Sequence, residues 1–305
     1  MVAKMSMQNQ KIAISGATGL VGGELIPLLK AAGHSILTLS RRNAGAGSIL
    51  WDPAKGVTPL GALEGVDAVV HLAGENIAGS RWTAAVKERI RSSRVEGTRN
   101  LVKSLALLKT PPKTLVCASA IGFYGHRGEE RLDESSMVGS GYLADVCKEW
   151  ESEAQEAEKL GLRVVRLRIG VVLSKKGGAL AKMLLPFKLG VGGIIGSGKQ
   201  YWSWIGLNDL VRIISFCIEN EAASGAVNAV SPNPMTNYDF TKAVGAVLHR
   251  PTIFPMPAFA AKLALGEMAD DLLLSSVRVE PHKLQSLGFQ FAQPDLTSCL
   301  KHELS

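Results

Sequence analysis

The chain has 305 residues, of which 46% are hydrophobic and 20% are charged. This balance is typical of a globular protein and excludes a chain dominated by disorder. The formal net charge of +7 indicates attraction to anions, but the sequence has no Lys/Arg run and no nucleic-acid-reading motif. We therefore expect a phosphorylated cofactor, and no nucleic acid, as the anionic partner.

The four cysteines lie far apart, with no CxxC pair and no histidine at ligand spacing. This pattern predicts reduced, buried thiols and no metal site. The first ten residues are polar and lack the apolar core of a secretory signal. No apolar stretch reaches the roughly 18 residues that would suggest a membrane span. We expect a cytoplasmic protein with no membrane partner.

Short apolar runs alternate with helical patterns through the first half of the chain. The helical patterns cover residues 83–108 and 141–160, besides a first helix that ends near residue 33. The alternation predicts an α/β fold, a Rossmann-type doubly wound parallel sheet with helices on both faces. The predicted strands are residues 11–15, 35–40, 67–72, 114–119 and 163–168.

The rhythm changes after residue 173, where Gly-rich and Pro-punctuated segments separate the helical patterns. Two helices are predicted, over residues 179–189 and 208–220, and Asp209 is placed to cap the second. We therefore predict a cofactor-binding core over residues 11–173. Residues 174–305 would form mostly a smaller substrate lobe and a C-terminal segment, with some strands returning to the core sheet.

A glycine-rich loop joins the first predicted strand to the first predicted helix. Residues 16–22, Gly-Ala-Thr-Gly-Leu-Val-Gly, form a GxxGxxG pattern. Glycine permits positive φ and lets backbone N–H groups approach a pyrophosphate, and the helix N-terminus adds a favourable dipole. With a strand before it and a helix after it, this loop predicts dinucleotide binding.

The end of the second predicted strand distinguishes between the two dinucleotides. Enzymes that use NAD usually place a carboxylate there to accept a hydrogen bond from the ribose. This chain has Ser40, Arg41 and Arg42, and no carboxylate before Asp52. Because a guanidinium pairs well with a 2′-phosphate, the pattern favours NADP(H). In the alternative interpretation, both arginines are solvated loop charges.

The loop after the strand at residues 67–72 continues the predicted cofactor site. His71 ends the apolar run, and Leu72, Ala73 and Gly74 should pass beside the ribose and pyrophosphate. We expect His71 to be a core residue at the strand end rather than a catalytic base.

Polar and aromatic residues follow this loop and recur in the later lobe. Aromatic side chains mixed with Lys and Arg could hold a flat or sugar-like anionic substrate, although the same residues could simply pack the lobe. The candidate substrate-binding residues are Glu75, Asn76, Arg81, Trp82, Met183, Lys199, Tyr201, Trp202 and Trp204.

Several longer motifs carry a family resemblance. They include GATGLVGGEL, HLAGENIAGSRW, SSRVEGTRNL, SAIGFYG and LLPFKLGVGGIIGSGKQYWSWI. From Lys11 to about Leu300 the chain resembles the YfcH-type branch of the NAD-dependent epimerase/dehydratase proteins, which are atypical extended members of the short-chain dehydrogenase/reductase superfamily. The resemblance implies a Rossmann core of about seven strands, a small substrate lobe and a small terminal domain.

The resemblance also implies which residues contact the cofactor. Ser40 and Arg41 would meet the adenosine phosphate, and Arg94 would approach from the helix after GSRW. Val171 and Val172 would flank the nicotinamide. The residues implied to line the pyrophosphate and the ribose are Gly16, Thr18, Gly19, Leu20, Val21, Gly22, Leu72, Ala73 and Gly74.

Catalysis in this superfamily uses a serine together with a Tyr-xxx-Lys pair on one helix face. Ser119 fits the serine. In GYLADVCKEWE, however, Tyr142 is followed four residues later by Val146, and Lys148 is preceded four residues earlier by Ala144. The pair is broken in this alignment.

A second alignment, which matches Cys147 to Glu151 with the usual Lys-xxx-Glu, places Leu143 and Cys147 at the Tyr and Lys positions. The pair is broken here too. Tyr142, one position off, could still reach the pocket, or Tyr124 could replace it from the loop after Ser119. We favour Tyr124 as the proton donor, with packing against the lobe as the alternative.

Two functions are compatible with these motifs. The first is an NADP(H)-dependent oxidoreductase or epimerase-like enzyme that acts on an unknown small carbonyl or sugar-like substrate, as a monomer or homodimer. The second is a non-catalytic NADP(H)-binding regulatory protein, since relatives in this branch have been linked to cell division. The broken Tyr-xxx-Lys pair favours the second, whereas Ser119 and the expected pocket favour the first.

Overall fold

The computed structural model describes residues 9–42, 45, 47–59 and 61–304. The polar N-terminal segment therefore lies outside the described residues, apart from Asn9 and Gln10. An eight-stranded sheet forms the centre of the fold, with strand order β12-β8-β6-β5-β1-β2-β3-β4. Its strands are β1 (Lys11–Ser15), β2 (Ser35–Ser40), β3 (Ser48–Asp52), β4 (Gly56–Thr58), β5 (Ala68–His71), β6 (Thr114–Ala120), β8 (Arg163–Ile169) and β12 (Gly225–Ala229).

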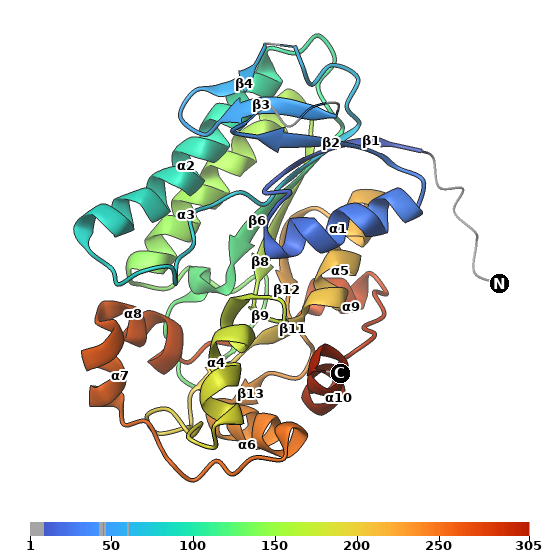
Figure 1. Ribbon diagram of the computed structural model, residues 1–305. Coiled ribbons are helices and arrows are strands. Elements are labelled where there is room, and N and C mark those ends of the chain that lie inside the picture. Colours follow the sequence, from blue (N-terminus) through green and yellow to red (C-terminus); the bar gives the residue numbers. More distant parts are fainter. Residues whose placement is uncertain (1–8, 43–44, 46, 60, 305) are drawn as a thin grey trace, which may run out of the picture.

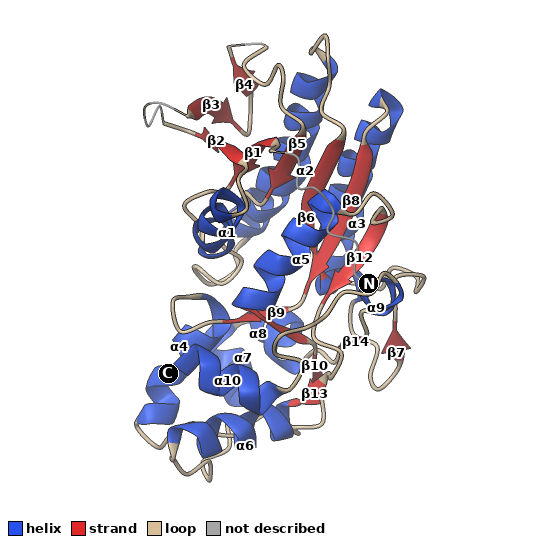
Figure 2. Ribbon diagram, turned by 90° about the vertical axis from the view of Figure 1, so that its right-hand side faces the viewer, coloured by secondary structure: helices blue, strands red, loops and turns tan. Residues whose placement is uncertain are grey.

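All neighbouring strands of this sheet are parallel except β3 and β4, which form an antiparallel edge. Helices α1 (Leu20–Ala31) and α5 (Leu207–Glu219) cover one face, and α2 (Ala84–Ala106) and α3 (Tyr142–Gln155) cover the other (Figures 1 and 2). The predicted Rossmann-type α/β fold is confirmed, and the alternation of strand and helix in the sequence is its cause.

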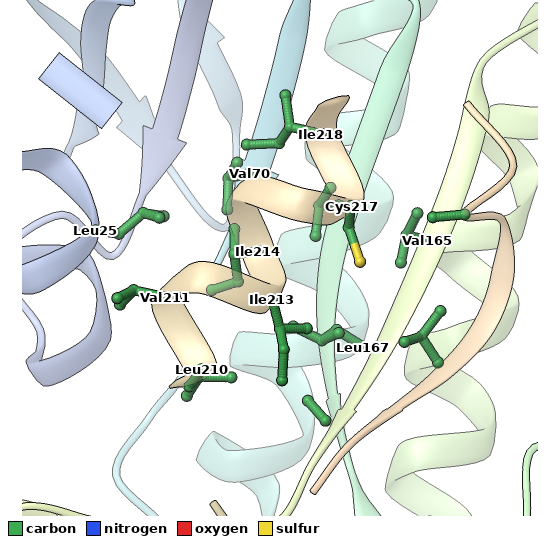
Figure 3. Close-up of a cluster of buried hydrophobic side chains, with 14 of the residues drawn as sticks. Leu25, Val70, Val165, Leu167, Leu210, Val211, Ile213, Ile214, Cys217 and Ile218 are labelled. Atoms are coloured by element: carbon green, nitrogen blue, oxygen red, sulfur yellow. The ribbon is translucent and has the colours of Figure 1, made fainter. Parts of the chain in front are cut away.

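Each face of the sheet has its own apolar core. On the first face, the apolar side chains of α5, among them Leu210, Ile213 and Ile214, pack with Val70 of β5 and Val165 of β8 (Figure 3). On the second face, side chains of α2 and α3 pack against the other sides of the same strands. Strands that are buried on both faces read as continuous apolar runs, which is why the sequence revealed them.

A smaller helical lobe lies beside the carboxyl ends of the strands, at the bottom of Figure 1. Its core joins buried side chains of the lobe helices with Trp202 and Trp204. The lobe elements are α4 (Gly178–Lys188), α6 (Asn237–Leu248), α7 (Ala258–Leu265), α8 (Glu267–Ala269) and α10 (Leu296–Leu304), with β9 (Val171–Leu173), β10 (Tyr201–Trp202), β11 (Trp204–Gly206) and β13 (Met235–Thr236).

The remaining short elements connect the lobe to the core. They are β7 (Arg131–Leu132) and β14 (Arg278–Val279), which pair with each other, and α9 (His282–Ser286). Helical turns cover Ile121–Tyr124, Glu156–Leu160 and Asp270–Leu274. After residue 173 the chain both builds the lobe and returns α5 and β12 to the sheet. The division at residue 173 remains a prediction.

The predicted cap at Asp209 is wrong. Gly206 precedes α5, and no side chain of the described chain caps this helix. Asp209 lies in the first turn, fully buried, where its carboxylate accepts hydrogen bonds from the N–H groups of Ala292 and Gln293 at 2.9 Å each. The carboxylate therefore anchors the C-terminal segment to α5.

None of the described helices is both long and apolar enough to cross a membrane.

Candidate functional site

The glycine loop leaves β1 at the carboxyl edge of the sheet, where the strand register places Ser15 between Leu39 of β2 and His71 of β5. Gly16 has a φ of +70°, and a Cβ atom there would lie 2.9 Å from the carbonyl carbon of Leu72. A Cβ atom at Gly22 would lie 2.8 Å from the Cα of Ala17 and closer still to the Gly16 oxygen. The loop therefore needs glycine at both positions, so that backbone packs on backbone.

The N-terminus of α1 opens directly from this loop. Gly19 precedes the helix, and no side chain in the described part of the chain caps it. The first N–H groups of a helix have no partner within the helix, and together with the dipole they form a site for a phosphate. Thr18 and Gly19 are exposed, and Leu20 and Val21 are half-buried. The geometry fits the pyrophosphate of a dinucleotide.

The end of β2 provides positive charge. Arg41 and Arg42 are exposed, and Arg41 forms no hydrogen bond or ion pair with any residue that the structure describes. The Ser40 hydroxyl accepts a hydrogen bond from the N–H of Arg42 at 3.2 Å. Asp52, the first carboxylate after the arginines, accepts instead from the N–H of Ala54 at 3.0 Å. This arrangement leaves Arg41 available for an anionic group.

A hydrogen-bond network holds the loop after β5 in place. The Ser15 hydroxyl accepts from the N–H groups of Leu72 (3.1 Å) and Ala73 (3.3 Å), and its oxygen lies 2.6 Å from Nδ1 of His71. A hydroxyl that accepts twice must donate to the histidine, so Nδ1 is the acceptor. Burial lowers the pKa of His71 to about 4, which keeps its ring neutral. His71 is a core residue, as predicted, whereas the role of Ser15 was not predicted because its partners are more than 50 residues away.

Arg94 lies beside the predicted ribose loop. A Cβ atom at Gly74 would be 3.2 Å from Cζ of Arg94, so the guanidinium fills the space next to this glycine. Its Cζ lies 5.2 Å from the centre of the Trp150 ring, and Nη1 donates to the carbonyl oxygen of Ile90 at 3.1 Å. Burial lowers the pKa of the guanidinium, and no described carboxylate forms an ion pair with it. Glu75 interacts with the guanidinium electrostatically but forms no ion pair with it, which leaves a half-buried cation suited to bind an anion.

Val171 and Val172 form β9 directly after β8 and are half-buried. Val172 packs into the same core as Leu20. A Cβ atom at Gly178 would lie 3.4 Å from Cδ2 of Leu20 and 3.5 Å from the Val172 oxygen. The loop before α4 therefore lies against both the start of α1 and β9, which brings two of the predicted cofactor segments together.

Ser119 does not have the free hydroxyl that its predicted catalytic role needs. It is only 3% exposed, and its hydroxyl donates to Oε1 of Glu151 at 2.8 Å. The same carboxylate binds Arg168 through two hydrogen bonds, from Nε at 2.8 Å and from Nη2 at 2.9 Å. Ser119 thus belongs to a buried ion-pair network, and this geometry corrects our expectation that it handles the substrate proton.

Tyr124 is not placed as a proton donor either. Its side chain is fully buried, and burial raises the pKa of its hydroxyl to about 12. The hydroxyl oxygen accepts from Nη1 of Arg168 at 2.9 Å and lies 2.7 Å from Oδ1 of Asn228 and 2.9 Å from the Asp133 oxygen. The hydroxyl is occupied by protein groups, so the alternative interpretation of Tyr124 as a packing residue fits the structure.

Tyr142, the other predicted donor, begins α3 and reaches α2 instead of a pocket at the sheet edge. Its hydroxyl donates to the backbone oxygen of Lys87 at 2.6 Å, and its ring makes an edge contact with Trp82. Burial raises the pKa of this hydroxyl to about 12. Tyr142 therefore holds the N-terminal halves of α2 and α3 together.

Two of the predicted substrate residues are core residues. Trp82 is 8% exposed and donates from Nε1 to the Ile77 oxygen, and Trp202 is 6% exposed, packed on Phe240. Trp202 packs the lobe core, which corrects its substrate-binding interpretation, whereas Trp82 packs with Met268 and Tyr142 and also lines an open cavity. Lys199 is exposed, and its N–H donates to Ser197.

Glu75 and Arg81 lie on the loop between β5 and α2. Both are exposed, and the N–H of Glu75 donates to Oγ of Ser93 at 3.0 Å. A Cβ atom at Gly266 would lie 2.9 Å from Nε of Arg81, so this arginine reaches the loop between α7 and α8. The two charged side chains therefore stand between the core and the lobe.

An open cavity of about 380 Å³ lies where the N-terminal halves of α2 and α3 meet α8. It contains none of the predicted cofactor residues. Its lining residues are Trp82, Thr83, Ala84, Lys87, Glu88, Arg91, Tyr142 and Glu267.

The described residues contain no group of three or more His, Cys, Asp or Glu side chains that could hold a metal ion. The four cysteines are free and buried, as predicted.

Comparison with known proteins places this fold in a family. A model of the NAD dependent epimerase/dehydratase family matches residues 12–230, and a model of a domain of unknown function (DUF1731) matches residues 256–303. The epimerase family protein Mb2239 of Mycobacterium bovis is 43% identical over 286 residues, which are 93% of this chain and 94% of the relative. The epimerase family protein YfhF of Bacillus subtilis is 38% identical over 295 residues, 95% and 96% of the two chains.

A solved structure extends the similarity to three dimensions. The crystal structure of the human epimerase family protein SDR39U1 (isoform 2) with NADPH matches with a TM-score of 0.88 at 34% identity. The match covers 96% of this chain and 98% of the human one. The chain therefore belongs to the NAD dependent epimerase/dehydratase family.

Proposed function

We propose that this protein is an NADP(H)-dependent oxidoreductase of the YfcH-type branch, which acts on a small carbonyl or sugar-like substrate. The observation that carries the proposal is a pair of anion-binding features along one edge of the sheet, the uncapped N-terminus of α1 and the unpartnered Arg41 at the end of β2 in the described chain. NADPH in the similar human structure supports the choice of cofactor.

Different segments of the chain would bind different parts of the cofactor. The glycine loop and the first N–H groups of α1 would receive the pyrophosphate. Arg41, with Ser40 and Arg42 beside it, would pair with the 2′-phosphate. The Ser15 hydroxyl would fix Leu72 and Ala73 at the ribose. When bound, the cofactor supplies a hydride-transfer group, and Val171 and Val172 would shield it from water.

Titration with NADPH and with NADH tests this proposal. We expect NADPH to bind more tightly than NADH. The variant Arg41→Glu should weaken NADPH binding by roughly tenfold or more, and NADH binding far less, because a charged hydrogen bond is lost and a like charge is added. Lys103→Glu on the exposed side of α2 makes the same charge change and should alter neither affinity. Equal losses of both dinucleotides in Arg41→Glu would contradict the assignment.

A specific observation favours a second function, a non-catalytic NADP(H)-binding regulator. The hydroxyls of Ser119, Tyr124 and Tyr142 are all bonded to protein groups, which leaves none of them to exchange a substrate proton. A screen of small carbonyl compounds under NADPH separates the two functions. Turnover supports the oxidoreductase, and tight NADPH binding without turnover supports the regulator. Sedimentation would separate the proposed monomer from the proposed homodimer.

A further inference from the structure

The helix that carries the Tyr-xxx-Lys pair in the superfamily has no cation at the lysine position of this chain, and its lysine, Lys148, is exposed. In the second alignment, the Tyr and Lys positions hold Leu143 and Cys147. A Cβ atom at Gly122 would lie 3.3 Å from Cβ of Leu143 and 3.8 Å from Sγ of Cys147, so both side chains face the turn after β6. Burial raises the pKa of the Cys147 thiol to about 11, and the residue is therefore neutral.

A cation from the neighbouring helix lies next to this position. The Arg94 guanidinium of α2 is close enough to Cys147 and Tyr142 to interact with both electrostatically. It stacks over Trp150, which follows Cys147 by one turn of α3. Its other side is against Gly74, where a Cβ atom would lie 3.2 Å from Cζ of the guanidinium, closer than an ordinary van der Waals contact. The guanidinium thus lies between the loop after β5 and the helix that follows β6.

Arg94 has no ion-pair partner among the described residues, although the Glu75 carboxylate interacts with it electrostatically. On the same helix, Arg91 pairs with Glu149 and Arg99 pairs with Glu153 of α3. The other carboxylate on this side of α3, Glu151, is bound by Arg168 and Ser119. Among the residues that the structure describes, the carbonyl oxygen of Ile90 is the one acceptor of a hydrogen bond from Arg94. A desolvated cation costs free energy unless an anion pairs with it, so this arrangement indicates a ligand anion.

The strand order shows which part of a dinucleotide would reach Arg94. Strands β5 and β6 lie on one side of β1, and β2 lies on the other. The adenosine phosphate would sit at Arg41 after β2, and the pyrophosphate at the glycine loop after β1. The rest of the molecule must then extend over β5 and β6, where Gly74 and Arg94 lie.

We propose that Arg94 of α2 replaces the lysine of the pair, whose position in α3 holds Cys147, and that it binds the nicotinamide half of NADP(H) through the phosphate and the ribose on that side. This inference rests on the proposed cofactor. A guanidinium has five donors, no acceptor and a permanent charge, so it can hold the cofactor but cannot pass a proton. Arg94 would therefore restore the positive charge of the missing pair and not its acid–base chemistry.

The experiment compares two ligands that differ in the nicotinamide half. NADPH has it, whereas adenosine 2′,5′-bisphosphate retains the 2′-phosphate and lacks the nicotinamide, its ribose and the adjacent phosphate. Calorimetry on the full chain measures both affinities for the wild type, Arg94→Met, Arg94→Gln and Arg94→Lys. Arg99→Met is the matched control, since it removes a paired arginine from the same helix.

We expect Arg94→Met and Arg94→Gln to weaken NADPH binding by roughly tenfold or more, with Arg94→Lys between them and the wild type. The affinity for the bisphosphate should stay within about twofold, and Arg99→Met should change neither. Thermal unfolding should show Arg94→Met at least as stable as the wild type, because an uncompensated charge is removed.

Two results would overturn the inference. Equal losses for NADPH and the bisphosphate would place Arg94 at the adenosine half, and unchanged NADPH binding in both neutral variants would remove it from the cofactor site. Failure of the proposed function would be seen separately, in the wild type, as absence of binding of either ligand.

Discussion

Arg168 and Glu151 form a bidentate ion pair in the interior of the protein, where both side chains are at most 5% exposed. The pair connects the end of β8 to α3, and it also ties Ser119 of β6 and Tyr124 of the following turn into one network. Ser119 and Tyr124, two of the three residues that the sequence predicted as catalytic, are thus the polar partners of a structural ion pair.

Glu151→Gln should be strongly destabilising. Removing one member of a buried pair leaves the other charge uncompensated, which costs about 3–5 kcal/mol. Glu153→Gln on the same helix is the control, because its partner Arg99 is half-exposed and such pairs contribute about 0–1 kcal/mol. Urea unfolding measures both. Similar small losses in the two variants would show that Arg168 is compensated in another way.

Tyr124→Phe should lower stability and leave cofactor binding intact. The variant removes a hydroxyl that accepts from Arg168 and lies within hydrogen-bond distance of Asn228, so buried polar groups lose a partner at a cost of about 1–3 kcal/mol. Tyr201→Phe is a suitable control, because no hydrogen bond of its hydroxyl occurs among the described residues. Lost turnover with unchanged stability in Tyr124→Phe would return this residue to the mechanism.

The sheet could be predicted because its strands are buried on both faces and its helices show a clear apolar period. The antiparallel edge of β3 and β4 was missed. Its strands have only five and three residues, and Leu50 in β3 is exposed, so neither gives a strong pattern. The glycine loop could be located for a local reason, since strand, turn and helix follow one another directly in the sequence.

Side-chain roles could not be predicted in the same way, because they depend on partners distant in the sequence. Ser119 meets Glu151 across 32 residues, and Tyr124 meets Asn228 across 104. Trp202 could be read as a pocket residue or a core residue, and only its burial decided for the core, whereas Trp82 is buried and also lines the cavity. Arg94 differs from these residues, because the family resemblance already implied that it approaches the cofactor. Its lack of an ion-pair partner in the described chain could be seen only in the structure.

His71 should make stability dependent on pH on the acid side. The folded protein holds the pKa of His71 at about 4, below the ordinary value of 6.5, so the unfolded chain binds the proton more readily. Stability is therefore complete above pH 6.5 and falls as the pH decreases toward 4, by about 3 kcal/mol in total. A proton on Nδ1 would also oppose the hydroxyl hydrogen of Ser15.

His71→Phe keeps a ring against Trp51 and removes the titrating group. We expect this variant to be less stable at neutral pH, because Ser15 loses its acceptor, but to show a flatter decline between pH 6.5 and 4. Urea midpoints measured across this range give the slope. A variant that declines as steeply as the wild type would assign the acid sensitivity to other groups.

Two adjacent glycines of α1 should respond in opposite ways to the same substitution. A Cβ atom at Gly22 would collide with the backbone of Gly16 and Ala17, and relief of that overlap must displace the cofactor loop. Gly22→Ala should therefore lose NADPH affinity and destabilise the protein by about 1–3 kcal/mol. At Gly23 nothing lies within 4 Å of a Cβ atom, and Gly23→Ala should stabilise the helix by up to about 1 kcal/mol. Because the two sites share one helix, a general effect of alanine on α1 would act on both alike. NADPH titration and thermal unfolding measure both variants. If Gly22→Ala and Gly23→Ala changed NADPH affinity and stability equally, the close packing of Gly22 on the glycine loop would not be what shapes the cofactor site.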